Sequence, residues 1–150
     1  GTVNVPGVYA FAVASKEMME EREAKWEKIS ALRHAIILSL EQRGIRFEVA
    51  GGKEGMQLPH IIAMLCDDIQ GQYVMMEMNR RGYSISTGSA CQAGMQAPSK
   101  TMIAIGKTPD EAKSYIRISL GNEHRSTDCE NFAAALVEIL KPVQNKGAAI

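Results

Sequence analysis

A cysteine inside a run of small side chains is the residue of this sequence best suited to nucleophilic chemistry. Residues 86–97 contain no large aliphatic or aromatic side chain except Met95, and Cys91 lies in the middle of them. Such a stretch buries little apolar area to offset its conformational entropy, about 1–2 kcal/mol per residue, so we expect it to be mobile. About six residues of tether, at about 3.3–3.6 Å each, would let the thiol move about 20 Å. That reach suits a thiol that collects a group at one site and delivers it at another.

The composition around Cys91 leaves an inert surface thiol open as the alternative. Cys66 ends an apolar run and is expected in the core. Cys129 lies near the start of the last predicted helix, where the helix dipole would lower a thiol pKa. It is therefore either a second reactive thiol or a residue that fills the inner face of that helix. An odd number of cysteines predicts no disulfide framework and favours a reducing, cytoplasmic setting.

One long helix is predicted over residues 8–43, after Pro6 and Gly7. At 1.5 Å per residue it would be about 54 Å long. That exceeds the diameter of about 26 Å expected for a compact chain of this size, so part of it should lie along a neighbouring domain or subunit. The prediction depends on apolar residues at three- and four-residue steps, namely Trp26, Ile29, Leu32, Ile36 and Leu40.

The remaining pattern predicts an α+β fold, a small and mainly antiparallel sheet with helices packed on one face. Capping-box patterns mark two helix starts, at Thr108–Glu111 and Thr127–Glu130, and Pro142 begins a frayed tail. The predicted strands are 45–50, a central strand 61–66, 83–86 and 115–120, and the other predicted helices are 70–81, 99–105 and the one that ends at Leu140.

Charge and hydropathy exclude several classes of protein. Seventeen basic and seventeen acidic side chains cancel, which argues against a nucleic-acid binder. The longest apolar runs, such as 60–66, fall far short of the roughly 20 residues that a membrane span needs. No signal peptide is visible and no initiator Met is present, so we expect a fragment of a longer chain. The histidines His34, His60 and His124 show no metal-ligand spacing with the cysteines, and no metal site is predicted.

Four segments of the chain, in order along nearly its whole length, resemble the NifS/IscS-type cysteine desulfurases. These enzymes depend on pyridoxal phosphate, have fold type I, and are similar to the class-V aminotransferases. Ser86 to Cys91, in the order Ser-Thr-Gly-Ser-Ala-Cys, resembles their active-site cysteine loop, and Ile116 to Gly121 resembles their substrate-arginine strand. Residues 1–7 resemble the segment that opens the C-terminal part of these enzymes. Residues 58–61, together with 75–82, resemble the stretch that precedes the cysteine.

This resemblance implies that residues 1–150 are the C-terminal small domain of such an enzyme. Within it, residues 1–43 would be a connecting helix region and residues 44–150 the α+β domain. The family usually forms homodimers and removes sulfur from L-cysteine, which gives L-alanine and an enzyme persulfide. The persulfide would form on Cys91 and supply iron–sulfur cluster assembly or another sulfur-transfer pathway. The implied partners are therefore L-cysteine, a second subunit, and a sulfur-acceptor or iron–sulfur scaffold protein.

The resemblance also implies a role for three residues. Cys91 would be the nucleophile, and it would need activation, because a thiol with a pKa of about 8.5 is only a few per cent thiolate at about pH 7. Arg117 would bind the substrate carboxylate, for which the planar guanidinium offers a bidentate fork. Thr2 would donate a hydrogen bond to the phosphate of the pyridoxal 5'-phosphate that the partner subunit binds.

The chain departs from the family pattern in lacking the lysine that carries the cofactor. In the family this lysine follows a histidine. No lysine of this sequence follows a histidine. We therefore expect the chain by itself to be inactive. Two alternatives remain at this point. The chain could be a non-enzymatic sulfur-relay or scaffold-docking module, or the small domain of another fold-type-I enzyme such as an aminotransferase, which has no use for a loop cysteine.

Overall fold

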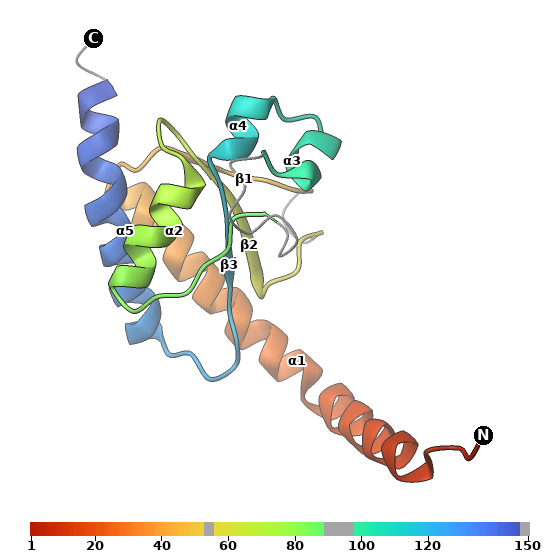
Figure 1. Cartoon of the computed structure of the whole chain (residues 1–150). Coiled ribbons are helices and arrows are strands. Elements are labelled where there is room, and N and C mark those ends of the chain that lie inside the picture. Colours follow the sequence, from red (N-terminus) through yellow and green to blue (C-terminus); the bar gives the residue numbers. More distant parts are fainter. Residues whose placement is uncertain (53–55, 89–97, 148–150) are drawn as a thin grey trace.

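Three antiparallel strands form a sheet in the order β1-β2-β3 at the centre of the molecule (Figure 1). The computed structural model describes residues 1–52, 56–88 and 98–147. β2 (Ile61–Cys66) pairs with β1 (Phe47–Val49) on one edge and with β3 (Tyr115–Ser119) on the other. The continuous apolar run is thus the central strand, as its sequence predicts.

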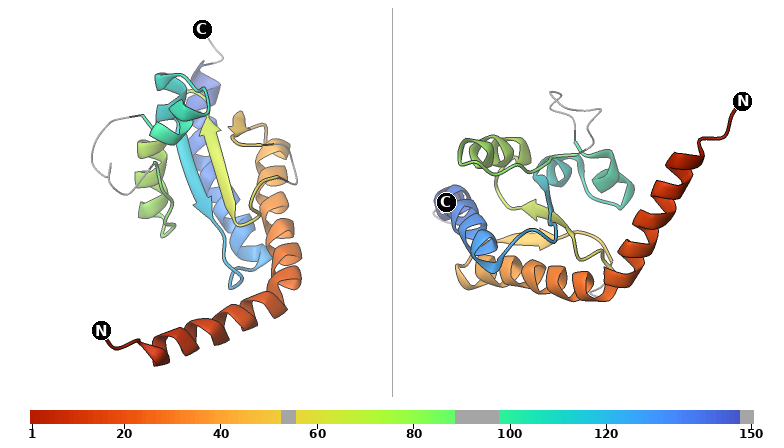
Figure 2. Two further views of the ribbon diagram at one scale, coloured as in Figure 1. Left: turned by 90° about the vertical axis from the view of Figure 1, so that its right-hand side faces the viewer. Right: turned by 90° about the horizontal axis from the view of Figure 1, so that it is seen from below.

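Five helices surround this sheet in the described part of the chain. Figure 2 shows α1 and α5 packed side by side along it. None of the described helices combines the length and hydropathy that crossing a membrane requires. The helices are α1 (Val5–Gln42), α2 (Gly71–Arg80), α3 (Lys100–Ala104), α4 (Pro109–Lys113) and α5 (Ser126–Gly147).

The two faces of the sheet differ, because side chains alternate along each strand. Ile62 and Ile116 point to one face, where they pack in a core built with α1, α2 and α5. Leu65 and Tyr115 lie in a smaller cluster on the opposite face, with Met102 of α3 and Ala112 and Ala50. The predicted small antiparallel sheet is confirmed, and the three longer helices pack on one face. The two short helices pack on the other face, against the end of the sheet where β3 begins.

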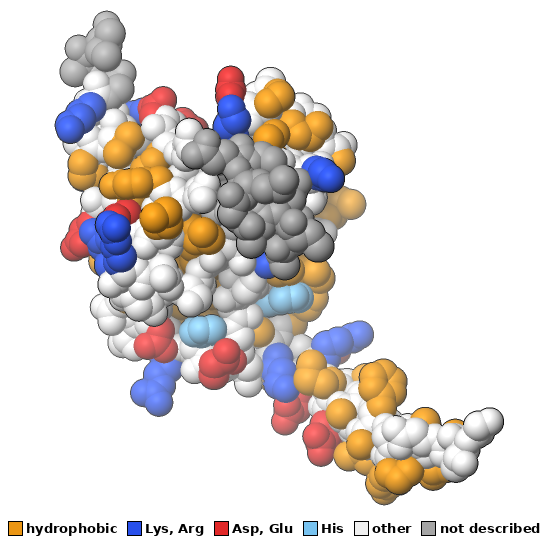
Figure 3. Space-filling view, viewed as in Figure 1, with side chains coloured by type: hydrophobic (Ala, Val, Ile, Leu, Met, Phe, Trp, Pro, Cys, Tyr) orange, Lys and Arg blue, Asp and Glu red, His pale blue; other side chains and the backbone are white. Residues whose placement is uncertain are grey.

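Only the C-terminal half of α1 belongs to the core. Its residues Leu32, Ile36 and Leu40 are buried, as the predicted stripe requires, but Trp26 is 45% exposed. The buried part of the stripe therefore starts C-terminal to Trp26, and Trp26 itself lies where the helix has already left the sheet. Figures 1 and 2 show the N-terminal half projecting from the body of the molecule, and Figure 3 shows hydrophobic side chains on its surface.

Several predicted boundaries are corrected by the structure. α1 begins three residues early because the side chain of Asn4 caps it, accepting the Gly7 N–H at 3.1 Å. The capping box at Thr108 is confirmed. The one predicted at Thr127 is wrong: α5 begins at Ser126, and Asp128 accepts the Arg125 N–H at 2.8 Å.

Two further elements differ from the prediction. α5 continues through Pro142 to Gly147, so the predicted frayed tail is helical as far as residue 147. Residues 148–150 of that tail lie outside the described residues. The predicted strand 83–86 is reduced to a single bridge, at Ser86.

A glycine lets α2 start directly against β3. A Cβ atom at Gly71 would lie 2.2 Å from the carbonyl oxygen of Tyr115, which no side chain can tolerate without a backbone shift. The N-terminus of α2 is therefore packed against the first residue of β3.

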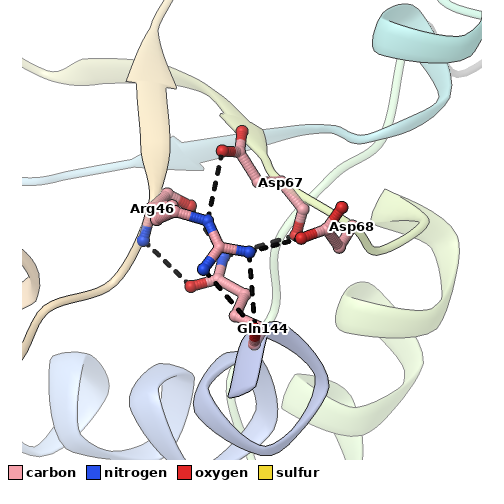
Figure 4. Close-up of polar contacts among 4 residues, drawn as sticks. All are labelled: Arg46, Asp67, Asp68 and Gln144. Carbon is pink, nitrogen blue, oxygen red and sulfur yellow. Dashed lines mark hydrogen bonds and ion pairs between the residues drawn. The ribbon is translucent and has the colours of Figure 1, made fainter. Parts of the chain in front are cut away.

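The helical continuation after Pro142 is held by Gln144, which is 2% exposed (Figure 4). Its side-chain oxygen accepts the Arg46 N–H at 2.9 Å, and its amide nitrogen donates to the Arg46 carbonyl oxygen at 2.7 Å. The guanidinium of Arg46 pairs with Asp67 and Asp68, in the turn after β2. The end of α5, the start of β1 and the β2–α2 turn are thereby joined.

We expect Gln144→Ala to lower the free energy of unfolding by about 2 kcal/mol, because it leaves the Arg46 N–H without its partner and removes one of the two N–H donors to the Arg46 carbonyl, the other being that of Asp67. Urea denaturation of the chain measures this change. Asn131→Ala, an exposed substitution on the same helix, is the matched control and should cost less than about 0.5 kcal/mol. Equal stabilities of the two variants would contradict the assigned role of Gln144.

Candidate functional site

Arg117, the predicted carboxylate-binding residue, lies in β3 on the face of the sheet opposite the main core. Its neighbours in the strand, Ile116 and Ile118, are both buried in that core. Alternation therefore turns Arg117 to the other face, where its directly paired residue on β2 is Ala63. Because α3 and α4 cover only the end of this face near Tyr115, Arg117 is only half-buried.

The other edge of β3 is occupied by Ser86. The Ser86 N–H donates to the Arg117 carbonyl at 3.1 Å, and the Arg117 N–H donates to the Ser86 carbonyl at 2.6 Å. The pair is thus an antiparallel bridge of two directly opposed residues. A third contact joins the side chains: Nη2 of Arg117 donates to Oγ of Ser86 at 3.3 Å.

The charge of Arg117 is not neutralised by any carboxylate within the described residues. The ion pairs found there involve other arginines, lysines and a histidine (Arg46, Arg80, Arg81, Lys16, Lys25, Lys107, Lys113 and His124). Burial raises the pKa of the nearby Tyr115, and the positive charge of Arg117 partly opposes that rise. This guanidinium can therefore receive an anion from outside the described residues.

Cys91, the predicted nucleophile, lies outside the described residues, but both ends of the segment that contains it are fixed. At one end Ser86 is bonded to β3. Thr87 follows it, with its hydroxyl 4.0 Å from the sulfur of Met75 in α2. At the other end the N–H of Ser99 donates to the Ala112 carbonyl at 3.4 Å, and its hydroxyl caps α3. Both attachments lie on or beside β3 and α4.

Thr2, the predicted phosphate ligand, is exposed and precedes the projecting half of α1. The N-terminus of the chain lies far from the sheet in both views of Figure 2, so this chain does not bring Thr2 and Arg117 together. The hydroxyl of Thr2 makes no hydrogen bond to another described residue. It is therefore available to a group outside these residues, beside the end of a long helix that favours anions.

The other two cysteines are buried and free. Burial, with a smaller effect of Asp67, raises the pKa of Cys66 to about 12. Burial also raises the pKa of Cys129, and the carboxylates of Asp128 and Glu130 add to the rise. The helix-dipole argument for Cys129 is therefore wrong in direction, and the packing role holds. Among the residues described, no group of three or more potential metal ligands is found.

The sequence pattern does not predict the contacts that two residues make with Arg117. Ser86 contacts Arg117 across 31 positions of sequence, and no spacing rule links the two. Ala63 belongs to the apolar run of the predicted central strand, and the register pairs its small side chain with Arg117. The one available signal was alternation along β2 and β3, which puts Ala63 and Arg117 on one face once the register is known.

Comparisons with known proteins show what the chain is similar to. A family model described as Aminotransferase class-V matches residues 1–132. A Bacillus subtilis (strain 168) protein named for the cysteine desulfurase NifS is 41% identical over 131 residues, 87% of this chain and 33% of the relative. The cysteine desulfurase IscS of Clostridium botulinum (strain Hall) is 28% identical over 141 residues, 93% of this chain and 36% of the relative.

Solved structures show the same fold. A NifS-like protein from Rickettsia africae ESF-5 superposes with a TM-score of 0.76 at 24% identity, over 93% of this chain and 35% of that one. Another NifS-like protein superposes with a TM-score of 0.75 at 23% identity, over 94% of this chain and 35% of that one. The chain spans about a third of the length of these relatives. The resemblance to NifS/IscS-type proteins that the four sequence segments indicate is confirmed.

We expect iodoacetamide at about pH 8 to place one alkyl group on the native chain, at Cys91. The raised pKa values of Cys66 and Cys129 keep both thiols protonated and unreactive at that pH. Peptide mass spectrometry locates the modification, and denatured chain, in which all three cysteines should react, is the control. Alkylation of Cys66 or Cys129 at the rate of Cys91 would contradict the burial argument.

Proposed function

This chain belongs to the class-V aminotransferase family, and from that premise we propose that it is the sulfur-accepting C-terminal small domain of a cysteine desulfurase. The reaction would remove sulfur from L-cysteine and release L-alanine. One observation carries the proposal most directly. Arg117, a guanidinium without a carboxylate partner among the described residues, is hydrogen-bonded to Ser86, where the cysteine-bearing segment begins.

The role we assign to Arg117 is to bind the carboxylate of L-cysteine. Arginine presents five N–H donors, and only the bond from Nη2 to Ser86 uses one within the described residues. A carboxylate takes two parallel bonds from such a fork, which lysine cannot supply. Substrate bound this way would be fixed to β3, a strand hydrogen-bonded on both edges.

The role we assign to Cys91 is to accept the sulfur. Five Cα–Cα steps of about 3.8 Å separate it from Ser86, so the tether allows at most about 19 Å between them. In the reaction, the Cys91 thiolate forms an S–S bond with the substrate sulfur while the substrate C–S bond breaks. The electron pair left on carbon takes a proton, which completes L-alanine. The resulting persulfide would pass its sulfur to an acceptor or iron–sulfur scaffold protein in a reducing, cytoplasmic setting.

Pyridoxal 5'-phosphate, when bound, would supply the electron sink that this chemistry needs. The residue of this chain that fits it is Thr2. Its exposed hydroxyl can donate to a phosphate oxygen, and the N-terminus of the 38-residue helix α1 adds a favourable dipole. Because Thr2 lies far from Arg117 in one chain, we propose that it serves the cofactor of a partner subunit. The lysine that carries the cofactor would come from the upstream part of the longer enzyme.

The projecting half of α1 supports assignment to a larger assembly. Residues 1–15 carry no charged side chain, and large apolar residues there are exposed, among them Tyr9 at 72% and Phe11 at 76%. A helix segment that is apolar on all sides is normally buried. We propose that the rest of the enzyme or its second subunit covers this half.

The proposal predicts that L-cysteine leaves one extra sulfur atom on Cys91 in the full-length enzyme, and that Cys91→Ser reduces sulfide release to background. Peptide mass spectrometry and a sulfide assay measure the two effects. Cys129→Ala, which removes a buried thiol elsewhere in the domain, is the matched control and should retain most of the activity. Sulfide release that survives Cys91→Ser would show that the assignment is wrong.

A second prediction concerns Arg117 and can be tested on the 150-residue chain. Iodoacetate carries a carboxylate and iodoacetamide does not, so a guanidinium within reach of Cys91 favours iodoacetate. We expect Arg117→Gln to lower the ratio of the iodoacetate to the iodoacetamide rate constant about fivefold. Two opposite charges about 4 Å apart in water attract by about 1 kcal/mol, and the loss of that attraction corresponds to this factor.

The matched control is Arg22→Gln, which makes the same change of net charge on the projecting half of α1 and should leave the ratio unchanged. Arg117→Lys keeps the charge without the planar fork, and its ratio should lie between those of Gln and Arg. Equal ratios for the unsubstituted chain and Arg117→Gln would remove Arg117 from the proposed site.

A further inference from the structure

The side chains of Ser86 and Arg117 are brought together by backbone pairing. In an antiparallel pair, two residues that exchange both backbone hydrogen bonds stand directly opposite one another, and their side chains project from the same face. Ser86 and Arg117 make both bonds, at 3.1 Å and 2.6 Å. The position of Ser86 is therefore set by the backbone of Arg117 and does not depend on the serine hydroxyl.

The guanidinium of Arg117 has a small side chain on each side. Ala63 is its paired residue on β2, and Ser86 its paired residue on the opposite edge. Ala63 offers no polar atom in its side chain. The hydroxyl of Ser86, which accepts from Nη2 at 3.3 Å, is the side-chain hydrogen-bond partner of Arg117 in the described part of the chain.

A neutral acceptor in this place has a definite physical consequence. A carboxylate beside Arg117 would orient the guanidinium but would also neutralise it and occupy its donors. A hydroxyl restricts the same rotation, carries no charge, and leaves four of the five N–H groups free. Arginine otherwise loses rotamer entropy when a ligand fixes it, so restriction before binding reduces the cost of binding an anion.

We propose that Ser86 is a positioning residue, whose hydroxyl holds the guanidinium of Arg117 in the orientation that receives a substrate carboxylate. The proposal rests on the proposed function, because it presumes that Arg117 binds a carboxylate. It adds that the affinity of that site depends on a residue which does not touch the substrate.

The test uses the same two reagents on the 150-residue chain. Ser86→Ala should lower the iodoacetate-to-iodoacetamide ratio about threefold, within the range expected for one hydrogen bond, and leave the iodoacetamide rate unchanged. Ser86→Thr retains a hydroxyl on the same backbone and should restore the ratio. Thr87→Ala, at the next position of the segment, is the matched control and should leave the ratio unaltered.

A purely structural role of Ser86 predicts a different result. If Ser86→Ala changes both rates by the same factor, the hydroxyl affects the segment and not Arg117, and the inference is overturned. An unchanged ratio in Ser86→Ala overturns it as well. The failure of the proposed function is distinguishable, since that failure would appear as an unchanged ratio in Arg117→Gln.

A second readout uses the full-length enzyme. There we expect Ser86→Ala to raise KM for L-cysteine about threefold with kcat unchanged, because carboxylate binding is weakened while the sulfur-transfer step is untouched. Ser86→Thr should return KM to its original value. A fall in kcat at unchanged KM would contradict a role in orienting Arg117.

Discussion

The alternation of side chains along β2 and β3 is the constraint on which this structure depends. With Ile62, Met64, Ile116 and Ile118 on one face, a continuous core forms against α1, α2 and α5. The same alternation forces Arg117 to the other face, where only the end near Tyr115 is covered by short helices. A shift of register by one residue would exchange the two sets, placing a charge in the core and leaving isoleucines exposed. The hydrophobic core thus determines which side of the sheet carries the chemistry.

β3 is well suited to hold a substrate-binding group because it is hydrogen-bonded on both edges. β2 pairs with it along five residues on one edge, and Ser86 pairs with Arg117 on the other. The cysteine-bearing segment starts at this second attachment, and it ends at Ser99, which is bonded to α4. Substrate binding and sulfur acceptance, as proposed, would therefore share one rigid support.

α1 has two halves with different roles. Its C-terminal half contributes Leu32, Ile36 and Leu40 to the core, and Arg33 donates to the Ile61 carbonyl at the start of β2. Its N-terminal half projects from the domain, and residues 1–15 at that end are exposed and carry no charged side chain. The helix is thereby attached to the domain at one end, while the other end offers a surface that a longer enzyme or a second subunit can cover. The relatives, about three times as long as this chain, are consistent with that division.

The sequence by itself determined the features that arise from neighbouring residues. The central strand, the helix over residues 71–80, the capping box at Thr108 and the resemblance to cysteine desulfurases all follow from local pattern. Tertiary structure alone decided the features that join distant residues. Gln144 bonds Arg46 across 98 positions, which keeps α5 helical beyond Pro142, and Ser86 bonds Arg117 across 31. Trp26 matches the helical stripe but is exposed. The spacing of apolar residues shows which face of the helix is apolar, but it does not show how far along the helix the core that covers this face extends. Propensity and periodicity act over a few residues, whereas a hydrogen bond between distant segments exists only after the core has set the register of the strands.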